Sequence, residues 1–435
     1  MAQVCLSSSN ASFAGFRPLH SRRLASMAEK RIDADDGVAY TWEELSAYYT
    51  GKYKKREIAA YWEECKPAKK GKKAKDESPE PKAKAKAKVE PKAKAKAKAK
   101  AKAKMGPARA FKVCVCGGSG GIGQPLSLLM AMDSSVKELS IFDLNVAMVP
   151  PAGVAADLNH VERKAKVVGY EMEVGKKPID VMEECLTGCD LVLIPAGMPR
   201  KPGMTRDDLF KVNADIAKGL VEACAKFCPQ AVLALIVNPV NSIVPAMAEL
   251  YKKKGLDPMK IVGVTTLDCV RANKFVAEIT GKNPNFINVP VVGGHAGTTI
   301  LPLFSKDKVS STIDAEKIPD LDKHVQDAGT DVVDAKGGKG SATLSMAYAG
   351  ARLGRSVLSG LAGKRRTECA YVKSDITDLP YFTSKVVFGE GGVSKVLPLG
   401  EINEYETVRL EEATAQLKTE IQTGLAYAET NDLAE

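Results

Sequence analysis

The feature that most constrains the fold is a glycine-rich stretch between an apolar run and an apolar helical segment. Residues 111–116 (Phe-Lys-Val-Cys-Val-Cys) are typical of a buried strand, and they lead directly into Gly117-Gly-Ser-Gly-Gly-Ile-Gly123. This is a variant of the loop that binds dinucleotides, in which glycines permit a tight turn and close approach to a pyrophosphate. The helix that follows would offer free N–H groups to an anion. The alternative is an ordinary tight turn between a strand and a helix.

The next apolar run strengthens the dinucleotide interpretation. It covers residues 138–142 and ends in Asp143, twenty residues after Gly123. An acidic side chain at this strand end accepts the ribose hydroxyls of NAD and repels the extra phosphate of NADP. We therefore predict an NAD site formed by Gly117, Gly120, Gly121, Ile122, Gly123 and Asp143.

The pattern of apolar runs predicts an α/β fold. Short runs at 111–116, 138–142, 190–195, 231–237 and 260–264 alternate with helical segments, which indicates βαβ units and a Rossmann-type, doubly wound parallel sheet. After about residue 285 strands mix with long helices, including 320–354 and 403–428. We predict an NAD-binding domain over 110–255 and an α+β catalytic domain over 256–435.

The net charge of +10 is confined to one segment. Residues 66–104 contain 17 lysines against four acidic residues, whereas residues 105–435 contain 37 basic and 40 acidic side chains. The Lys-Ala repeats place like charges around every face of a helix, so we predict that 66–109 is a low-complexity, self-repelling linker. The alternative, compatible with the first, is an arm that binds a polyanion. A polyanion or a protein could therefore be a partner of residues 29–104.

The rest of the N-terminal extension divides into two parts. Residues 1–28 contain arginines and serines but no acidic residue, a composition typical of an organelle transit peptide; an ordinary disordered terminus is the alternative. Residues 29–65 are rich in aromatic residues, and Thr41 and Glu44 have the spacing of a capping box. We predict a small helical hairpin in an otherwise largely disordered extension. No apolar run is long enough for a transmembrane helix.

Three further segments carry candidate chemistry. The loop after the run at 190–195 contains Arg200 and Arg206, Asp268 and Arg271 are spaced for one face of a helix, and His295 is flanked by glycines. Taken singly, these could be a solvated loop, a surface ion pair and a structural histidine. Together they suit hydride transfer from an alcohol, which needs a base for the hydroxyl proton and cations for an anionic substrate.

Six ordered motifs give residues 110–430 a specific resemblance. They lie at 120–124, 195–209, 238–242, 263–273, 293–297 and 340–347. This part of the chain resembles the NAD-dependent malate dehydrogenases of mitochondria and bacteria, a branch of the lactate/malate dehydrogenase superfamily. The resemblance implies reversible oxidation of (S)-malate to oxaloacetate, as in the tricarboxylic acid cycle, with NAD as cofactor, no metal, and a homodimer.

The resemblance also implies roles for individual residues. His295 would take the hydroxyl proton and Asp268 would orient it. The substrate would be held by Arg200, Arg206, Arg271 and Asn238, while Asn213, Asn238 and Met346 match positions around the cofactor. Because malate carries two carboxylates, Arg200 facing the distal one would select dicarboxylates over pyruvate.

Location and thiol chemistry are less constrained. The transit-peptide composition and the resemblance predict the mitochondrial matrix, with a plastid or another organelle and then the cytosol as alternatives. Ten cysteines in 435 residues are too few for a disulfide scaffold. Cys114 and Cys116 are interpreted as packed small apolar residues, and a redox-sensing Cys116 is the alternative.

Overall fold

The computed structural model describes residues 31–32, 39–49, 55–67, 110–198 and 206–434. These residues fall into two compact units, one within Met1–Pro91 and one within Lys92–Glu435, and each is described by itself. The predicted transit peptide, the predicted linker from residue 68 onward and Arg200 lie outside the described residues, whereas Lys66 and Pro67 form a short strand. Within the described ranges, no helix is both long and apolar enough to cross a membrane.

The N-terminal unit contains the predicted helical hairpin. Helices α1 (Trp42–Tyr49) and α2 (Lys55–Glu64) lie beside a small antiparallel sheet in the order β2-β1-β3. Its strands, which we did not predict, are β1 (Arg31–Ile32), β2 (Ala39–Tyr40) and β3 (Lys66–Pro67). The capping box is confirmed, since Glu44 N donates to Thr41 Oγ1 at 3.3 Å and Thr41 N donates to Glu44 Oε2 at 2.9 Å.

This unit has its own aromatic core. Leu45, Tyr49, Ile58, Trp62 and Cys65 are buried together. The rings of Trp42 and Trp62 meet edge to face at 5.8 Å between centroids. The guanidinium of Arg31 lies 5.3 Å from the centre of the Trp62 ring and donates to the Trp62 carbonyl at 2.8 Å. These contacts join the first strand to the second helix.

The larger unit is built on a parallel sheet with the predicted Rossmann-type order. Its parallel strands run in the order β6-β5-β4-β7-β8-β9. They are β4 (Phe111–Cys116), β5 (Val136–Leu144), β6 (Lys166–Met172), β7 (Leu191–Ile194), β8 (Val232–Leu235) and β9 (Ile261–Gly263). The chain order reverses between β4 and β7, and ligands of such sheets bind at this switch point.

Both faces of this sheet are covered, because alternate residues of each strand enter opposite cores. In β4, Val113 and Val115 belong to one buried cluster with Leu126 of α4, whereas Cys114 and Cys116 belong to the other. Burial on both faces explains why the strand reads as a continuous apolar run. The flanking helices are α4 (Gly123–Ala131), α5 (Pro151–Leu158), α6 (Pro178–Val181), α7 (Glu183–Leu186), α8 (Arg206–Phe227) and α9 (Val240–Lys253).

The second half continues the same sheet with antiparallel strands. Tyr371 of β12 pairs with Gly263 of β9, and the order then runs β12-β13-β10-β11 with β14 beside β13. The strands are β10 (Val291–Gly293), β11 (Ile300–Pro302), β12 (Arg366–Lys373), β13 (Tyr381–Gly389) and β14 (Gly392–Val396). The predicted α+β half is therefore confirmed as an antiparallel extension.

The long helical stretch that we predicted over 320–354 is two helices. The helices of this half are α10 (Thr266–Thr280), α11 (Ile318–Ala335), α12 (Leu344–Leu361) and α13 (Glu404–Glu429). Gly337, Gly338 and Gly340 separate α11 from α12 with φ angles of +60°, +74° and +148°, outside the helical region. Short 3-10 turns lie at Pro258–Lys260, Pro284–Phe286, Gly297–Thr299, Phe304–Lys306, Ser310–Thr312 and Ala315–Lys317.

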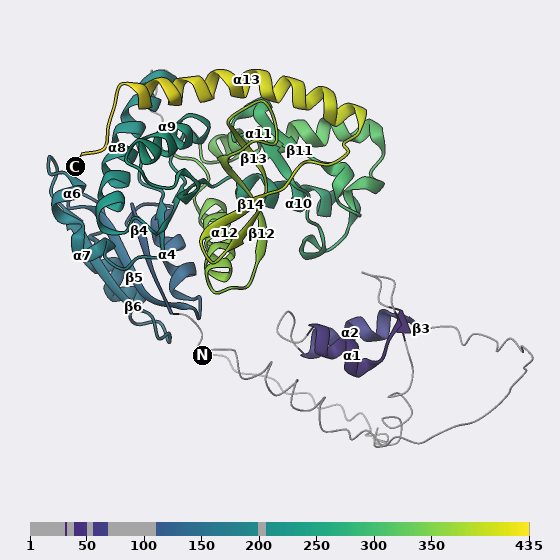
Figure 1. Cartoon of the computed structure of the whole chain (residues 1–435). Helices are drawn as coiled ribbons and strands as arrows, with labels where there is room; N and C mark the ends of the chain where they lie inside the picture. Colours follow the sequence, from purple (N-terminus) through teal and green to yellow (C-terminus); the bar gives the residue numbers. More distant parts are fainter. Residues whose placement is uncertain (1–30, 33–38, 50–54, 68–109, 199–205, 435) are drawn as a thin grey trace, which may run out of the picture. The chain divides into compact units, whose positions relative to one another are not determined.

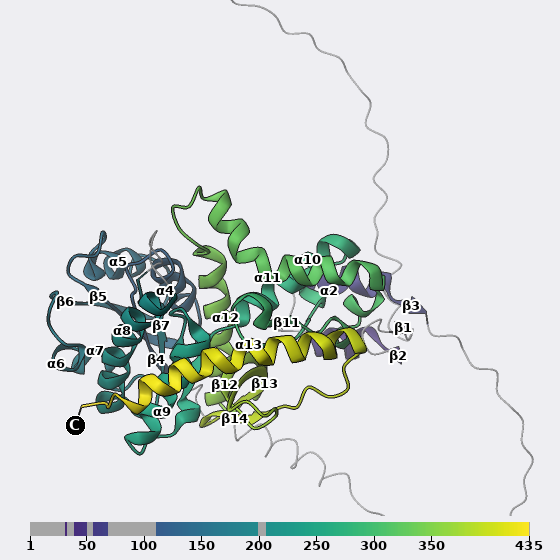
Figure 2. The same ribbon diagram turned by 90° about the horizontal axis from the view of Figure 1, so that it is seen from above.

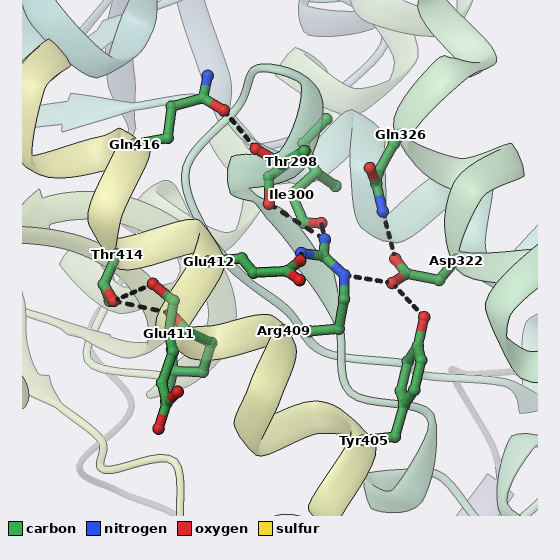
Figure 3. A network of polar contacts seen from close by, with 11 residues as sticks. Thr298, Ile300, Asp322, Gln326, Tyr405, Arg409, Glu411, Glu412, Thr414 and Gln416 are labelled. Carbon is green, nitrogen blue, oxygen red and sulfur yellow. Dashed lines mark hydrogen bonds and ion pairs between the residues drawn. The ribbon is translucent and has the colours of Figure 1, made fainter.

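Helix α13 runs along the unit from α9 towards α11 (Figures 1 and 2). Its Arg409 is buried and donates to Asp322 of α11 at 2.8 Å, to Glu412 at 2.7 Å and to the carbonyl of Thr298 at 3.1 Å (Figure 3). Asp322 also accepts from Tyr405 Oη at 2.9 Å. This network ties α13 to α11 and to the turn before β11.

The Arg409 network predicts a large loss of stability on removal of one partner. Asp322→Asn removes the buried carboxylate and leaves Arg409 with the exposed Glu412 as its acidic partner, so the free energy of unfolding should fall by about 3 kcal/mol, the lower end of the cost of breaking a buried pair. Asp327→Asn is the control, because Asp327 forms an exposed pair with Lys323 on the same helix, worth about 1 kcal/mol or less. Urea denaturation measures both variants, and equal losses would contradict this account.

Candidate active site

The candidate residues gather at one edge of the sheet. A predicted site residue lies at or shortly after the carboxyl end of the parallel strands β4, β5, β8 and β9 and of the antiparallel strand β10. Gly117 follows β4, Asp143 is the next-to-last residue of β5, and Asn238 lies shortly after β8. Asp268 lies in the first turn of α10, after β9, and His295 follows β10. The topology thus brings together residues that are far apart in the sequence.

The glycine loop lies close to its own main chain. Gly117 has φ of +92°, and a Cβ there would lie 2.8 Å from Cα of Ala196. A Cβ on Gly123 would overlap the carbonyl oxygen of Gly117. The loop therefore requires glycine at both positions, and its Gly120 and Gly121 are exposed. Such a cradle fits the pyrophosphate of a dinucleotide.

The surroundings of the loop include the other residues predicted around NAD. A Cβ on Gly121 would lie 3.2 Å from Cγ2 of Thr343, which directly precedes α12. Met346, in the first turn of α12, and Ile122, at the start of α4, pack into the same core cluster. Met346 therefore lies on α12, the helix whose start is close to the glycine loop.

Asp143 is half buried and fastened to the loop. Its Oδ2 accepts from the backbone N–H of Ser119 at 2.9 Å, and its Oδ1 accepts from the N–H of Leu144 at 2.8 Å. A carboxylate oxygen can accept more than one hydrogen bond. Asp143 can therefore hold the loop and still accept from two ribose hydroxyls.

Asp268 and His295 form the central polar contact. Nδ1 of His295 lies 2.6 Å from Oδ2 of Asp268, which has no exposed surface. An ionised carboxylate can only accept, so Nδ1 carries the proton and Nε2 is left to accept another. This is the tautomer that a general base requires.

Arg271 places a cation beside this pair. Its Nη1 lies 3.7 Å from Oδ1 of Asp268, one helical turn away on α10. Burial lowers the pKa of the Arg271 guanidinium, and the carboxylates of Asp268 and Asp331 act in the opposite direction. An arginine remains charged even so. The predicted pairing of Asp268 and Arg271 on one helix face is confirmed, in a buried setting and not at the surface.

Asn213, predicted around the cofactor, forms hydrogen bonds with the main chain. Its side chain is buried, and Oδ1 accepts from the N–H of Met198 at 2.7 Å. Nδ2 donates to the carbonyls of Met198 at 3.1 Å and of Asn238 at 2.7 Å. Both amide hydrogens are thus used by the main chain. Asn213 holds the loop after β7 against Asn238, whose own side chain is exposed at the edge of the site.

The predicted arginines of the loop after β7 are described only in part. Arg200 lies outside the described residues, and Arg206 is the first residue of α8.

Sequence reasoning missed Asn241, which is buried and accepts from the backbone N–H of His295 at 2.8 Å. In the described ranges, no group of three or more His, Cys, Asp or Glu side chains is arranged to hold a metal ion.

The cysteines of the described residues are free and buried. Cys114 and Cys116 lie in the core beneath the glycine loop, with 3.8 Å between their sulfur atoms. A hydrogen bond with Cys114 lowers the pKa of Cys116, but burial and neighbouring thiols raise it, and the net change is upward. A buried thiol with a raised pKa is a poor nucleophile, which favours the packing interpretation.

Family comparisons agree with this geometry. Residues 111–263 match the description "lactate/malate dehydrogenase, NAD binding domain", and residues 265–428 match "lactate/malate dehydrogenase, alpha/beta C-terminal domain". The chain is 53% identical to a mitochondrial malate dehydrogenase of Chlamydomonas reinhardtii over 317 residues, 73% of this chain and 82% of that protein. It is 51% identical to a glyoxysomal malate dehydrogenase of Cucumis sativus over 324 residues, 74% of this chain and 88% of the relative.

Solved structures show the same fold. A lactate dehydrogenase from Cryptosporidium parvum, complexed with lactic acid and NAD, has a TM-score of 0.63 and 25% identity, covering 75% of this chain and 100% of its own. A malate dehydrogenase from Picrophilus torridus in its apo form has a TM-score of 0.65 and 24% identity, covering 74% of this chain and 99% of its own. The second likeness concerns the fold alone.

Proposed function

This chain belongs to the lactate/malate dehydrogenase family and is an NAD-dependent malate dehydrogenase, and we propose that His295 and Asp268 carry its proton transfer. The observation behind the proposal is the 2.6 Å contact between Nδ1 of His295 and a fully buried carboxylate. The reaction is the reversible oxidation of (S)-malate to oxaloacetate.

His295 acts as the general base. Its Nε2 accepts the proton of the malate C2 hydroxyl, and Asp268 stabilises the imidazolium that forms. In the reverse direction the same imidazolium returns the proton to the carbonyl oxygen of oxaloacetate. Asp268 also prevents the ring from turning, because its hydrogen bond fixes Nδ1 towards the core.

The cofactor fits the glycine cradle. When bound, NAD supplies the acceptor for the hydride that leaves C2. In our proposal the backbone of Gly117, Gly120, Gly121, Ile122 and Gly123 approaches its pyrophosphate, and Asp143 accepts its ribose hydroxyls. Met346 contributes from α12. Asn213 acts at one remove, since it positions Asn238 through the Asn238 carbonyl.

Cations select the substrate. Arg271, held beside Asp268, would form a bidentate pair with the C1 carboxylate. Arg206 would polarise the reacting oxygen, Asn238 would donate to it, and Arg200 would bind the distal carboxylate. These four roles follow from the family motifs that the residues occupy, and they make the substrate a dicarboxylate.

A homodimer is the assembly that we propose. Helices α4 and α12 pack together, as shown by the 3.4 Å that would separate a Cβ on Gly350 from Cδ1 of Leu126. Their outer faces expose the large apolar side chains Leu128, Met132, Leu344 and Tyr348. We propose that a second subunit covers these side chains, since exposed apolar patches often mark subunit contacts. Sedimentation equilibrium tests it, and a monomer at micromolar concentration would refute it.

For location we propose the mitochondrial matrix, with residues 1–28 as the transit peptide. Mitochondrial relatives support an organelle, but glyoxysomal and peroxisomal relatives are as similar to this chain. For residues 66–104 we propose a solvated linker that can also contact a polyanion. N-terminal sequencing of the protein from fractionated organelles tests both ideas, because loss of residues 29–104 in the mature enzyme would leave the linker without a role there.

Removal of the Asp268 charge should abolish most turnover. Asp268→Asn keeps the side-chain shape but can favour the wrong imidazole tautomer, so kcat for oxaloacetate reduction should fall by about 10³–10⁴-fold. The affinity for NADH, followed by fluorescence titration, should stay near the wild-type value. Asp314→Asn, at an exposed position, is the matched control. Wild-type turnover by Asp268→Asn would overturn the proposed roles.

Substitution of Arg200 should change substrate choice. Arg200→Gln leaves the distal carboxylate without a cation, so kcat/KM for oxaloacetate should fall by a factor on the order of 10³ while activity on pyruvate rises. Arg163→Gln, at an exposed position after α5, should change neither. Steady-state NADH oxidation with each keto acid measures the effect, and nearly intact oxaloacetate turnover would show that Arg200 has another role.

A further inference from the structure

The buried amide of Asn241 connects the catalytic histidine to the C-terminal helix. Asn241 lies in the first turn of α9 and is almost fully enclosed, with 1% of its side chain exposed. We infer that Asn241 and Glu420 form a pair that positions the backbone of His295 in the active site. This inference rests on the proposed role of His295 as the general base.

Every hydrogen-bonding group of the Asn241 amide has a partner. Oδ1 accepts from the backbone N–H of His295 at 2.8 Å. Nδ2 donates to Oγ1 of Thr299 at 3.1 Å and to Oε2 of Glu420 at 2.6 Å. A flipped amide would set N–H against the N–H of His295 and oxygen against a carboxylate. The partners therefore determine the orientation of the amide, and its oxygen must face His295.

Thr299 closes the turn that carries His295. Its hydroxyl accepts from the N–H of Ala296 at 3.0 Å and from Asn241, and it donates to the carbonyl of Ala296 at 2.7 Å. A hydroxyl has one hydrogen and two lone pairs, so this oxygen has no capacity left. The turn from His295 to Thr299 is thus fixed to Asn241 at both of its ends.

Glu420 supplies a carboxylate to this contact, and it comes from α13. Gln416, one turn earlier, donates to Oε1 of Glu420 at 2.9 Å and accepts from Oγ1 of Thr298; Figure 3 shows the latter contact between α13 and the turn. On the other side, Tyr371 donates to the carbonyl of Asn241 at 3.2 Å. Helix α13 is held by the Arg409 network. Through Gln416 and Glu420 the same helix also supports the turn that carries His295.

The glycines before His295 are packed closely against Thr299 and Asn241. Gly293 has φ of +92°, and a Cβ there would overlap the carbonyl oxygen of Thr299. A Cβ on Gly294 would lie 2.6 Å from both Nδ2 of Asn241 and Oγ1 of Thr299. The turn is packed directly on the Asn241 amide, so a change at Asn241 moves the backbone of His295. A displacement of about 1 Å at a reacting group can cost about 10²-fold in rate.

The pair can be tested by exchanging its polarity. Asn241→Asp sets a second carboxylate against Glu420, so kcat for oxaloacetate reduction should fall by about 10²-fold. Glu420→Gln should remain within about tenfold of wild type, because a glutamine can still present its oxygen to Asn241 although its NH2 then faces the donating Gln416. In Asn241→Asp/Glu420→Gln the glutamine donates to the new carboxylate, and kcat should recover to within about tenfold of wild type.

Two readouts separate positioning from general damage. The affinity for NADH should be unchanged in all variants, while kcat falls by as much as about 10²-fold only in Asn241→Asp. Glu411→Gln, exposed on the same helix, is the matched control. Rescue in the double variant supports the inference, and wild-type kcat in Asn241→Asp, or a folded double variant no better than it, overturns the inference.

A second variant decides the case if Asn241→Asp does not fold. Glu420→Ala removes the acceptor at the outer helix, and we expect kcat to fall by about tenfold with NADH affinity retained. Unchanged kcat in Glu420→Ala would overturn the inference. Inactivity of the wild-type chain towards oxaloacetate would instead refute the proposed function, so the two failures are distinguishable.

Discussion

The structure of the site depends on one buried carboxylate. Asp268 has no exposed surface, and burial of an unpaired carboxylate would be strongly unfavourable. His295 supplies a hydrogen bond to one oxygen at 2.6 Å, whereas the other oxygen has no hydrogen-bond partner and faces Arg271 at 3.7 Å. His295, the proposed base, and the Arg271 cation therefore both contact the same carboxylate, and this shared contact fixes the distance between them.

The sheet topology allows that contact. Asp268 starts the helix after the last parallel strand, and His295 follows a strand of the antiparallel extension. The two halves are continuous, since Tyr371 pairs with Gly263 and its hydroxyl also donates to the carbonyl of Asn241. The catalytic turn therefore rests on α9 from the cofactor half and on α13 from the C-terminus. An enzyme that must align a cofactor with a proton acceptor gains a rigid frame from this arrangement.

Local patterns predicted much of this, and long-range contacts explain most of what they did not. The strand over 111–116, the glycine loop and the Thr41 capping box follow from rules that involve neighbouring residues, so they were predictable. Strand β6 was missed because its residues are partly exposed and do not form an apolar run. Likewise the contact between Asn241 and Glu420 joins residues 179 positions apart, and nothing local marks either one. The hydrogen bonds of Asn213 to the main chain of Met198 and Asn238 are likewise not marked by any local pattern.

The net charge of the whole chain, +10, says little about how the substrate is bound. The excess of lysine lies in residues 66–104, ahead of the dehydrogenase domains, and in our proposal a few arginines within those domains recognise the dianion. The most direct test is the reduction of oxaloacetate and of pyruvate by the unmodified full chain in one assay. The account predicts a preference for oxaloacetate in kcat/KM on the order of 10³-fold or more, because pyruvate has no second carboxylate to pair with the arginine that we propose for the distal position. Comparable values for the two substrates, or no turnover of oxaloacetate, would contradict it.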